Sequence, residues 1–241
     1  MAFRNGTLYF TANGRIRKVT SSGVITTIAG NGGSGWVADG TPALAAPLDP
    51  HAITFGPHGN LYVADDQEVL RLNADNTFTR ILGVKTANGV YGIGRPALQA
   101  SADAANGLAF DAKDDLYIAG FAAKNLLMID PHGILHLIGS LYPRTEGGLI
   151  TGPHGTVIAS DTRAVDRLSP SRIEPISSFG GSIFDGVHSF SPNGITISPT
   201  GTIYIDTFGG NGYSSESAIA AINPNGTSFL LWEQHQPPSQ G

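Results

Sequence analysis

The chain has 241 residues, of which 41% are hydrophobic and only 14% are charged, and it contains no cysteine. Its 32 glycines and 15 prolines exclude a coiled coil, while the apolar content and the net charge of −5 argue against disorder. The lack of cysteine excludes a disulfide scaffold and a cysteine-ligated zinc site. No apolar run approaches the roughly 20 residues of a membrane helix. Because acidic residues also outnumber basic ones, we expect neither a membrane nor a nucleic-acid partner.

The first residues of this chain do not resemble a targeting signal. Met1-Ala2-Phe3-Arg4 leads at once into an apolar segment at residues 6–10, without the charged and apolar regions of a signal peptide. We therefore expect no signal peptide and no transmembrane segment here, and the compartment is left open.

A short pattern, Gly-x-Leu-Tyr-apolar and its close variants, recurs five times along the chain. The copies occupy residues 6–10, 59–63, 114–118, 155–159 and 201–205. They follow one another at intervals of about 40 to 55 residues, which is typical of repeat architectures.

Each unit contains three further apolar segments separated by turn residues. The segment before the repeated pattern lies at 51–55, 106–110, 147–151 or 193–197, with Met1-Ala2-Phe3 as its short counterpart in the first unit. The two segments after it lie at 15–19 and 24–28, 69–72 and 78–82, 126–129 and 135–138, 165–168 and 173–176, and 219–222 and 228–231. Turns such as 130–133 and 223–226 separate them. Each unit is therefore predicted to form four short strands.

Five units of four strands predict an all-β fold, a β-propeller of four-stranded antiparallel blades. One blade cannot bury both faces of its twisted sheet, so stacked blades bury one another and their first strands line a central channel. We expect a single domain over residues 1–241. The approximate blades are 1–30, 51–83, 106–139, 147–179 and 193–232.

The repeat resembles the NHL family of β-propellers. The second strand of that family is similar to Asn60–Asp65, its third strand to Arg15–Val19, and its glycine-rich linker to Gly30–Gly40 with the following segment 41–46. The family usually has six blades, whereas five are visible here. Three alternatives follow: a closed five-bladed ring, a six-bladed propeller that lacks one blade, or a ring completed by self-association with another chain.

The residues that open the first strands are predicted to lie at the mouth of the channel. They include His51, Asn106 and Asn193, and the loops after the second strands bring Asp65, Asp66 and Asp206 to the same rim. Imidazole, amide and carboxylate groups that converge there could bind a cation or a polar ligand. For Asp65 and Asp161 we favour a structural role, in which the side chain accepts backbone N–H groups of the next turn.

The segment Thr207–Ser217 is rich in glycine and serine and is predicted to be a long rim loop, with Phe208, Tyr213 and Glu216 as ligand contacts. Trp36, in the linker, is predicted to pack on the neighbouring blade.

The chain resembles the SMP-30/gluconolactonase-like propellers more distantly. The resemblance implies a divalent cation in the channel, calcium before others, held by Asn, Asp and Glu side chains. Asn106-Gly107-Leu108 and Asn193-Gly194-Ile195 are similar to one ligand motif of these propellers. Two amides need a carboxylate to hold a divalent ion tightly. Glu146 is the first candidate and Asp206 the second.

Three functions are left open. The first is a non-catalytic NHL-type module that needs no cofactor and binds a protein or a small polar ligand through its rim loops. Its ligand-binding candidates are His51, Asn106, Asn193, Phe208 and Tyr213. The second is a metal-dependent hydrolase or lyase of the lactonase type, with His51 as general base. The third is a truncated or engineered repeat fragment. We favour the first because no nucleophile elbow or phosphate loop is present.

Overall fold

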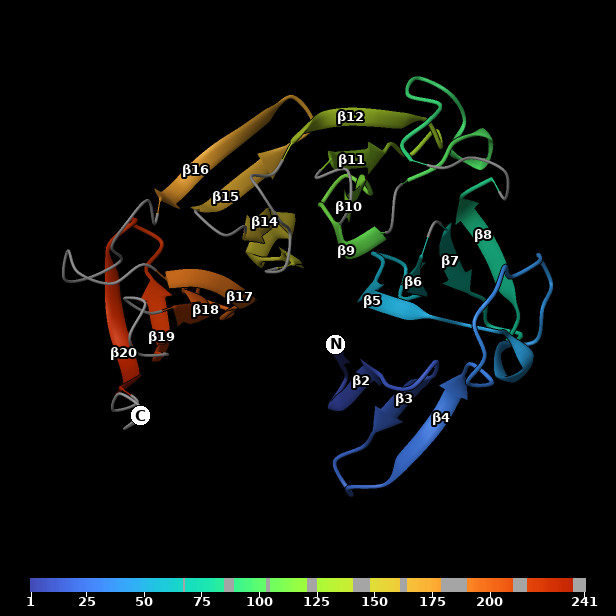
Figure 1. Ribbon diagram of the computed structural model, residues 1–241, viewed down its shortest axis with the longest axis horizontal. Helices are drawn as coiled ribbons and strands as arrows, with labels where there is room; N and C mark the ends of the chain where they lie inside the picture. The colour runs from blue at the N-terminus through green and yellow to red at the C-terminus, as the bar shows by residue number, and fades with distance from the viewer. Residues whose placement is uncertain are drawn as a thin grey trace, which may run out of the picture. The chain divides into compact units, whose positions relative to one another are not determined.

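A computed structural model describes residues 1–66, 68–84, 89–102, 105–120, 125–140, 148–160, 164–178, 190–209 and 216–235. In these residues the chain forms twenty β-strands and three short 3-10 helices (Figure 1). None of the helices described is long enough or apolar enough to cross a membrane.

The strands form five four-stranded sheets, and within each sheet the strands pair in chain order and antiparallel. Blade 1 comprises β1 (Ala2–Arg4), β2 (Thr7–Thr11), β3 (Ile16–Val19) and β4 (Ile25–Ala29). Blade 2 comprises β5 (Pro50–Phe55), β6 (Leu61–Asp65), β7 (Glu68–Leu72) and β8 (Phe78–Leu82). Blade 3 comprises β9 (Ala105–Phe110), β10 (Leu116–Gly120), β11 (Asn125–Ile129) and β12 (Leu135–Ser140).

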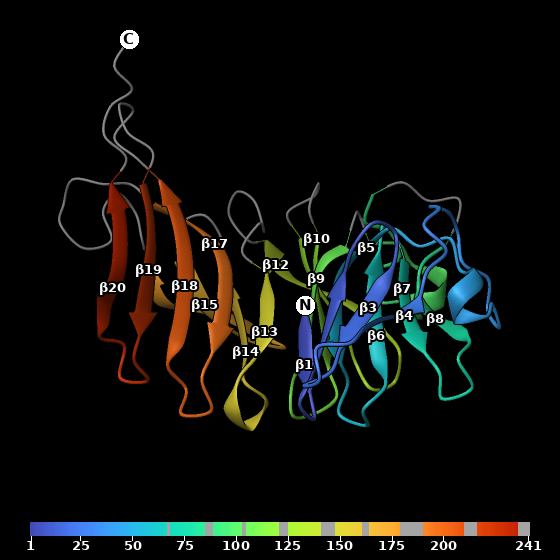
Figure 2. The ribbon, with the colours of Figure 1, turned by 90° about the horizontal axis from the view of Figure 1, so that it is seen from below.

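The last two blades follow the same order. Blade 4 comprises β13 (Leu149–Thr151), β14 (Val157–Ser160), β15 (Ala164–Ser169) and β16 (Arg172–Ser178). Blade 5 comprises β17 (Phe190–Ile197), β18 (Ile203–Gly209), β19 (Glu216–Ile222) and β20 (Ser228–His235). Figure 2 shows the strands of blade 5, β17 to β20, side by side. The prediction of an all-β propeller with five four-stranded antiparallel blades is confirmed.

The chain divides into two compact units, Met1–Leu137 and Ile138–Gly241. The first unit holds blades 1 to 3 up to the middle of β12, and the second holds blades 4 and 5.

Blade 2 is buried on both faces because its residues alternate between two hydrophobic clusters. Leu61 and Val63 of β6 pack with Ile16 of blade 1, whereas Ala64 of the same strand packs with Leu127 of blade 3. Successive side chains of a strand point to opposite faces of the sheet. The period of two in the sequence therefore gives each blade two apolar faces. In the second unit, Ile158 and Val165 of blade 4 pack against three residues of blade 5, Ile203, Ile205 and Ile222.

The glycine-rich linker between blades 1 and 2 is part of the core of the first unit. Val37, Leu48 and the short helix η1 (Ala43–Ala45) bring apolar side chains into the cluster between the two blades. The linker starts at Gly30, whose φ is +87° and whose amide donates to the carbonyl oxygen of Ala43 at 2.8 Å. A Cβ at Gly30 would lie 2.8 Å from Arg15 Cα, so glycine is required at this close approach.

The prediction of a loop over Thr207–Ser217 is wrong at both ends of this segment. Strand β18 continues to Gly209 and β19 starts at Glu216, and Phe208 pairs with Ser191 on one side and Ser217 on the other. Backbone pairing with two neighbouring strands overrides the weak strand preference of glycine and serine. Phe208 and Glu216 therefore lie in strands rather than in a rim loop.

Candidate functional site

The hairpin between β6 and β7 places two acidic residues directly opposite each other. Asp65 is the last residue of β6, Glu68 is the first residue of β7, and they are register partners. Asp66, in the turn between them, has a φ of +50°, a left-handed conformation that aspartate tolerates better than most residues. Asp65 follows Leu61 and Val63 at intervals of two, so its side chain lies on the blade face that the linker covers.

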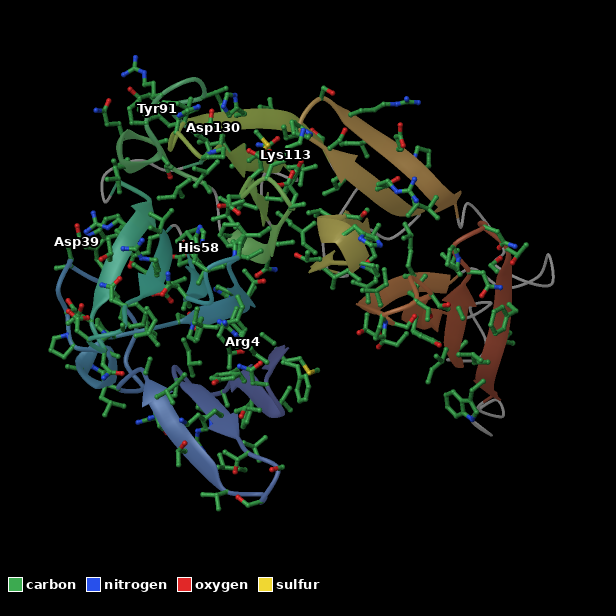
Figure 3. All side chains as sticks on the ribbon, turned by 180° about the vertical axis from the view of Figure 1, so that it is seen from behind. Arg4, Asp39, His58, Tyr91, Lys113 and Asp130 are labelled. Carbon is green, nitrogen blue, oxygen red and sulfur yellow. The ribbon has the colours of Figure 1, made fainter. Side chains whose placement is uncertain are left out.

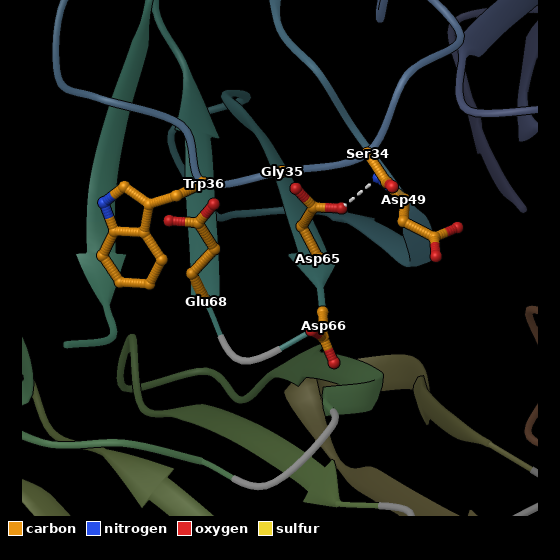
Figure 4. A pocket seen from close by; sticks show the side chains of 7 residues that line it. All are labelled: Ser34, Gly35, Trp36, Asp49, Asp65, Asp66 and Glu68. Atoms are coloured by element: carbon orange, nitrogen blue, oxygen red, sulfur yellow. Dashed lines mark hydrogen bonds between the residues drawn. The ribbon is translucent and has the colours of Figure 1, made fainter. Parts of the chain in front are cut away.

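A pocket of about 250 Å³ opens beside these two carboxyl groups. Its lining consists of a linker segment, the residue before β5 and the hairpin: Ser34, Gly35, Trp36, Asp49, Asp65, Asp66 and Glu68 (Figure 4). Asp65 and Glu68 are only 3% and 2% exposed, whereas Asp49 and Asp66 are exposed at the rim. This pocket lies entirely within the first unit, and we name it the acidic pocket.

Both buried carboxylates hold the linker by its backbone. An oxygen of Asp65 accepts a hydrogen bond from the amide of Asp49, which Figure 4 shows as a dashed line. Glu68 Oε1 accepts one from the amide of Val37 at 2.9 Å. The predicted structural role of Asp65, as an acceptor of backbone N–H, is therefore observed, while Asp161 lies outside the described residues. The donor, however, precedes β5 and does not belong to the turn that follows Asp65.

Arg80 of β8 also holds the linker against blade 2. Its guanidinium lies 3.4 Å from Glu68 Oε2, donates to the carbonyl oxygen of Val37 at 3.3 Å, and lies 4.3 Å from the centre of the Trp36 ring. Its backbone amide donates to Asp39 at 2.6 Å, and Asp39 lies on the linker (Figure 3). Trp36 thus packs on blade 2 through Arg80. These contacts pre-organise the walls of the pocket.

Burial changes the acidity of the two carboxyl groups. Desolvation raises the pKa of Asp65 to about 7, against the opposing effect of the hydrogen bond from Asp49. Desolvation also raises the pKa of Glu68 to about 7, and the charge of Asp65 adds to the rise, while the Val37 amide and Arg80 oppose it. Both groups can therefore exchange a proton near neutral pH.

Each of these carboxyl groups keeps one oxygen without a hydrogen bond. Among the residues that the structure describes, none donates to Asp65 Oδ2, and Glu68 Oε2 has only the ion-pair contact with Arg80. Glu68 Oε2 is fully buried, whereas Asp65 Oδ2 is not among the fully buried atoms that lack a partner, so Asp65 Oδ2 is the oxygen that a ligand with a donor group can reach. Chemically, the arrangement can bind a donor group or accept a proton.

The residues predicted at the channel mouth share a local feature, the β-bulge. His51 is skipped between the paired residues Pro50 and Ala52, Asn106 is skipped at the start of β9, and Asn193 is skipped between Pro192 and Gly194. Bulges are over-represented next to active sites, where they redirect a side chain. His51 is exposed and Asn106 is half-buried in the first unit, whereas the side chain of Asn193 lies outside the described part.

Asp206 lies in the second unit, in strand β18, opposite Gly194. A Cβ at Gly194 would collide with Asp206 Oδ1, so the glycine of the Asn-Gly motif makes room for this carboxylate. Three predicted site residues cannot be placed. Glu146, the metal candidate, and Tyr213, a ligand candidate, lie outside the described part, as does the side chain of the ligand candidate Phe208. In the part of the chain that is described, no three His, Asp or Glu side chains gather as a metal site would require.

Glu68 is the functional candidate that the sequence interpretation missed. The signal was present in the run Asp65-Asp66-Gln67-Glu68 between two apolar segments. A two-residue hairpin turn places the residues on either side of it opposite each other, on one face of the sheet. What the run does not show is that the linker covers this face.

The chain is similar in fold to several solved propeller enzymes. A catalytically inactive virginiamycin B lyase from Staphylococcus aureus, solved with quinupristin, has a TM-score of 0.58 and 14% identity over 93% of this chain and 66% of its own. A gluconolactonase from Xanthomonas campestris has a TM-score of 0.61 and 13% identity over 97% of this chain and 72% of its own. A luciferin-regenerating enzyme has a TM-score of 0.57 and 18% identity over 96% and 73%.

These similarities show the fold alone. The chain is a β-propeller. It matches no protein-family model and no curated protein. It therefore shares the propeller architecture of lactonase-like and lyase propellers, and the more specific resemblance to NHL repeats stays a prediction.

Proposed function

We propose that this chain is a ligand-binding β-propeller and that a small polar molecule binds, without being transformed, in the acidic pocket of blade 2. The observation that carries the proposal is Asp65, a carboxylate that is 3% exposed and keeps an open acceptor oxygen beside a pocket of about 250 Å³. An oxygen of a residue that lines the pocket gains a hydrogen bond when a ligand with a donor group enters.

The rigidity of the pocket supports the same function. The linker that forms one wall is held by Asp65, Glu68 and Arg80, so little of it needs to be ordered when a ligand binds. Pre-organisation of this kind reduces the entropic cost of binding. Because unrelated functions share the propeller fold, the enzymes of similar fold neither require nor exclude a binding role.

Thermal melts with sugars, sugar acids, amino acids and amines test this proposal. We expect at least one of these classes to raise the Tm, since a ligand at 100 times its Kd adds about 2.7 kcal/mol to the stability of the native state. Asp49→Asn and Asp66→Asn, at the exposed rim, should reduce the shift.

Glu174→Gln provides a charge-matched control, because Glu174 forms an ion pair with the exposed Arg172 in the second unit. A panel without any shift, or a shift that survives both rim substitutions, would exclude a site in the acidic pocket.

The second candidate is a metal-dependent hydrolase or lyase of the lactonase type. Two observations favour it: the bulges at His51, Asn106 and Asn193, and the fold shared with proteins named as gluconolactonases and lyases. In this candidate the two Asn residues, with Glu146 and Asp206, hold a divalent cation, calcium before others. The ion would polarise a substrate carbonyl.

A melt of metal-stripped protein with calcium, magnesium, manganese or zinc tests the second candidate. If the chain is such an enzyme, one ion should raise the Tm by several degrees. Glu146→Gln should abolish this rise, because a neutral amide replaces the carboxylate. Asn106→Ala should weaken the response, and Glu174→Gln should leave it unchanged. An identical melting curve with every ion would remove this candidate.

A further inference from the structure

We propose that the acidic pocket selects small organic cations, whose ammonium or guanidinium group donates a hydrogen bond to Asp65 in a pocket that Glu68 and Trp36 also line. This inference rests on the proposed function, since it names the chemical class of the ligand that the same pocket binds.

The first argument is the charge of the pocket. Four of the seven lining residues carry a carboxyl group, and none of the seven is basic. Arg80 contacts Glu68 and Trp36 but does not line the pocket. A positively charged ligand is therefore attracted, whereas an anion meets like charges.

The second argument is the type of hydrogen-bonding atom that is left open. Asp65 Oδ2 is an acceptor to which no described residue donates a hydrogen bond, whereas Glu68 Oε2 is fully buried against Arg80 and out of reach of a ligand. A ligand that fits the pocket must bring N–H or O–H donors. Ammonium and guanidinium groups carry only donors and a positive charge, so they match both requirements.

Arg80 shows that a guanidinium group suits this environment. It lies between a carboxylate and an indole, 3.4 Å from Glu68 Oε2 and 4.3 Å from the centre of the Trp36 ring. Cations are attracted to the face of an indole ring. A ligand cation in the pocket would meet the same two types of group, together with Asp65.

The geometry favours an organic cation over a metal ion. Asp65 and Glu68 each use one oxygen to bind a backbone amide, and the second oxygen of Glu68 is buried against Arg80. Calcium needs six to eight oxygen ligands, and no group of three metal-binding side chains occurs among the residues described. A volume of about 250 Å³ lies below the ~300 Å³ at which pockets for drug-sized ligands begin. The ligand is therefore a small amine or guanidine.

Calorimetric titration with a matched four-carbon series tests this inference. Putrescine carries two ammonium groups, butane-1,4-diol is neutral and succinate carries two carboxylates, while agmatine replaces one ammonium by guanidinium. We expect putrescine or agmatine to bind at least about tenfold more tightly than the diol or succinate, with affinity falling as salt is added. The affinity should rise from pH 6 to pH 8, because Asp65 and Glu68 ionise in this range.

Asp65→Asn should weaken the binding of the cation at least about tenfold, and Glu174→Gln should leave it unchanged. If Asp65→Asn does not fold, the double variant Asp49→Asn/Asp66→Asn gives the same test at the exposed rim. Equal binding of butane-1,4-diol or succinate would overturn the inference and leave the proposed function standing, as would tighter binding of calcium than of putrescine. Failure of the whole series and of the wider panel above would overturn the proposed function itself.

Discussion

Replacing Arg80 by methionine is expected to destabilise the protein by about 2 to 3 kcal/mol at pH 8 and by only about 1 kcal/mol at pH 5. At pH 8 the substitution leaves the ionised Glu68, 2% exposed, without its counter-ion. At pH 5 Glu68 is mostly protonated, because its pKa is raised to about 7. Only the contacts with Val37 and Trp36 are then lost. Urea denaturation at the two pH values measures both free energies of unfolding.

The control for this prediction is the same substitution made in a Glu68→Gln background. Without a carboxylate, Arg80→Met should cost about 1 kcal/mol at either pH, which isolates the charge interaction as the difference. The backbone amide of Arg80 still binds Asp39 in both variants, so that contact does not contribute. An equal cost of Arg80→Met at pH 5 and pH 8 in the otherwise unchanged protein would show that the ion pair is unimportant.

The melting temperature is expected to fall by about 10 °C between pH 5 and pH 8. The pKa values of Asp65 and Glu68 are raised to about 7 in the folded protein, so the native state holds these protons more tightly than the unfolded chain. Their contribution is complete below the unfolded pKa values near 4 and is lost as the pH rises through 7. The combined loss is on the order of 4 kcal/mol.

Two further groups act in or near this window. Burial lowers the pKa of the Met1 amino group, which opposes the fall in Tm, and burial raises the pKa of Asp115, which adds to it. Asp75 and Asp130, whose pKa values are lowered by hydrogen bonds, act with the opposite sign and below pH 4. Asp65→Asn and Glu68→Gln should each flatten the slope between pH 5 and pH 8, whereas Glu174→Gln should not. Differential scanning calorimetry across this range is the measurement. A Tm that stays constant or rises in the unsubstituted protein would contradict the assignment of raised pKa values.

The five blades could be predicted from the sequence because their signals are local. The alternation of apolar residues along segments such as Leu61–Asp65, together with glycine-containing turns, specifies where strands begin, end and pair. The prediction was wrong in Thr207–Ser217, where glycine and serine suggested a loop but both flanking strands continue. Strand propensity is weak there, and pairing with the neighbouring strands decides the outcome.

The candidate site could be predicted only in part. Asp65 was identified as a structural acceptor, and Trp36 as packing on a blade, because both belong to recurring local patterns. Glu68 was missed, although its spacing of three residues from Asp65 predicts that the two share a face of the hairpin. The bulges at His51, Asn106 and Asn193 were not expected, since a bulge depends on the register of the partner strand.

By itself, the sequence determined the number of repeats, the four strands of each and the hairpins that place Asp65 opposite Glu68, because neighbouring residues specify all of these features. Only the tertiary structure decided that both carboxylates are buried, that each holds a linker amide and that Arg80 joins Glu68 to Trp36. These contacts join residues 12 to 44 positions apart in the chain. The linker reaches these side chains because its apolar residues pack between blades 1 and 2, and no local sequence pattern specifies that packing.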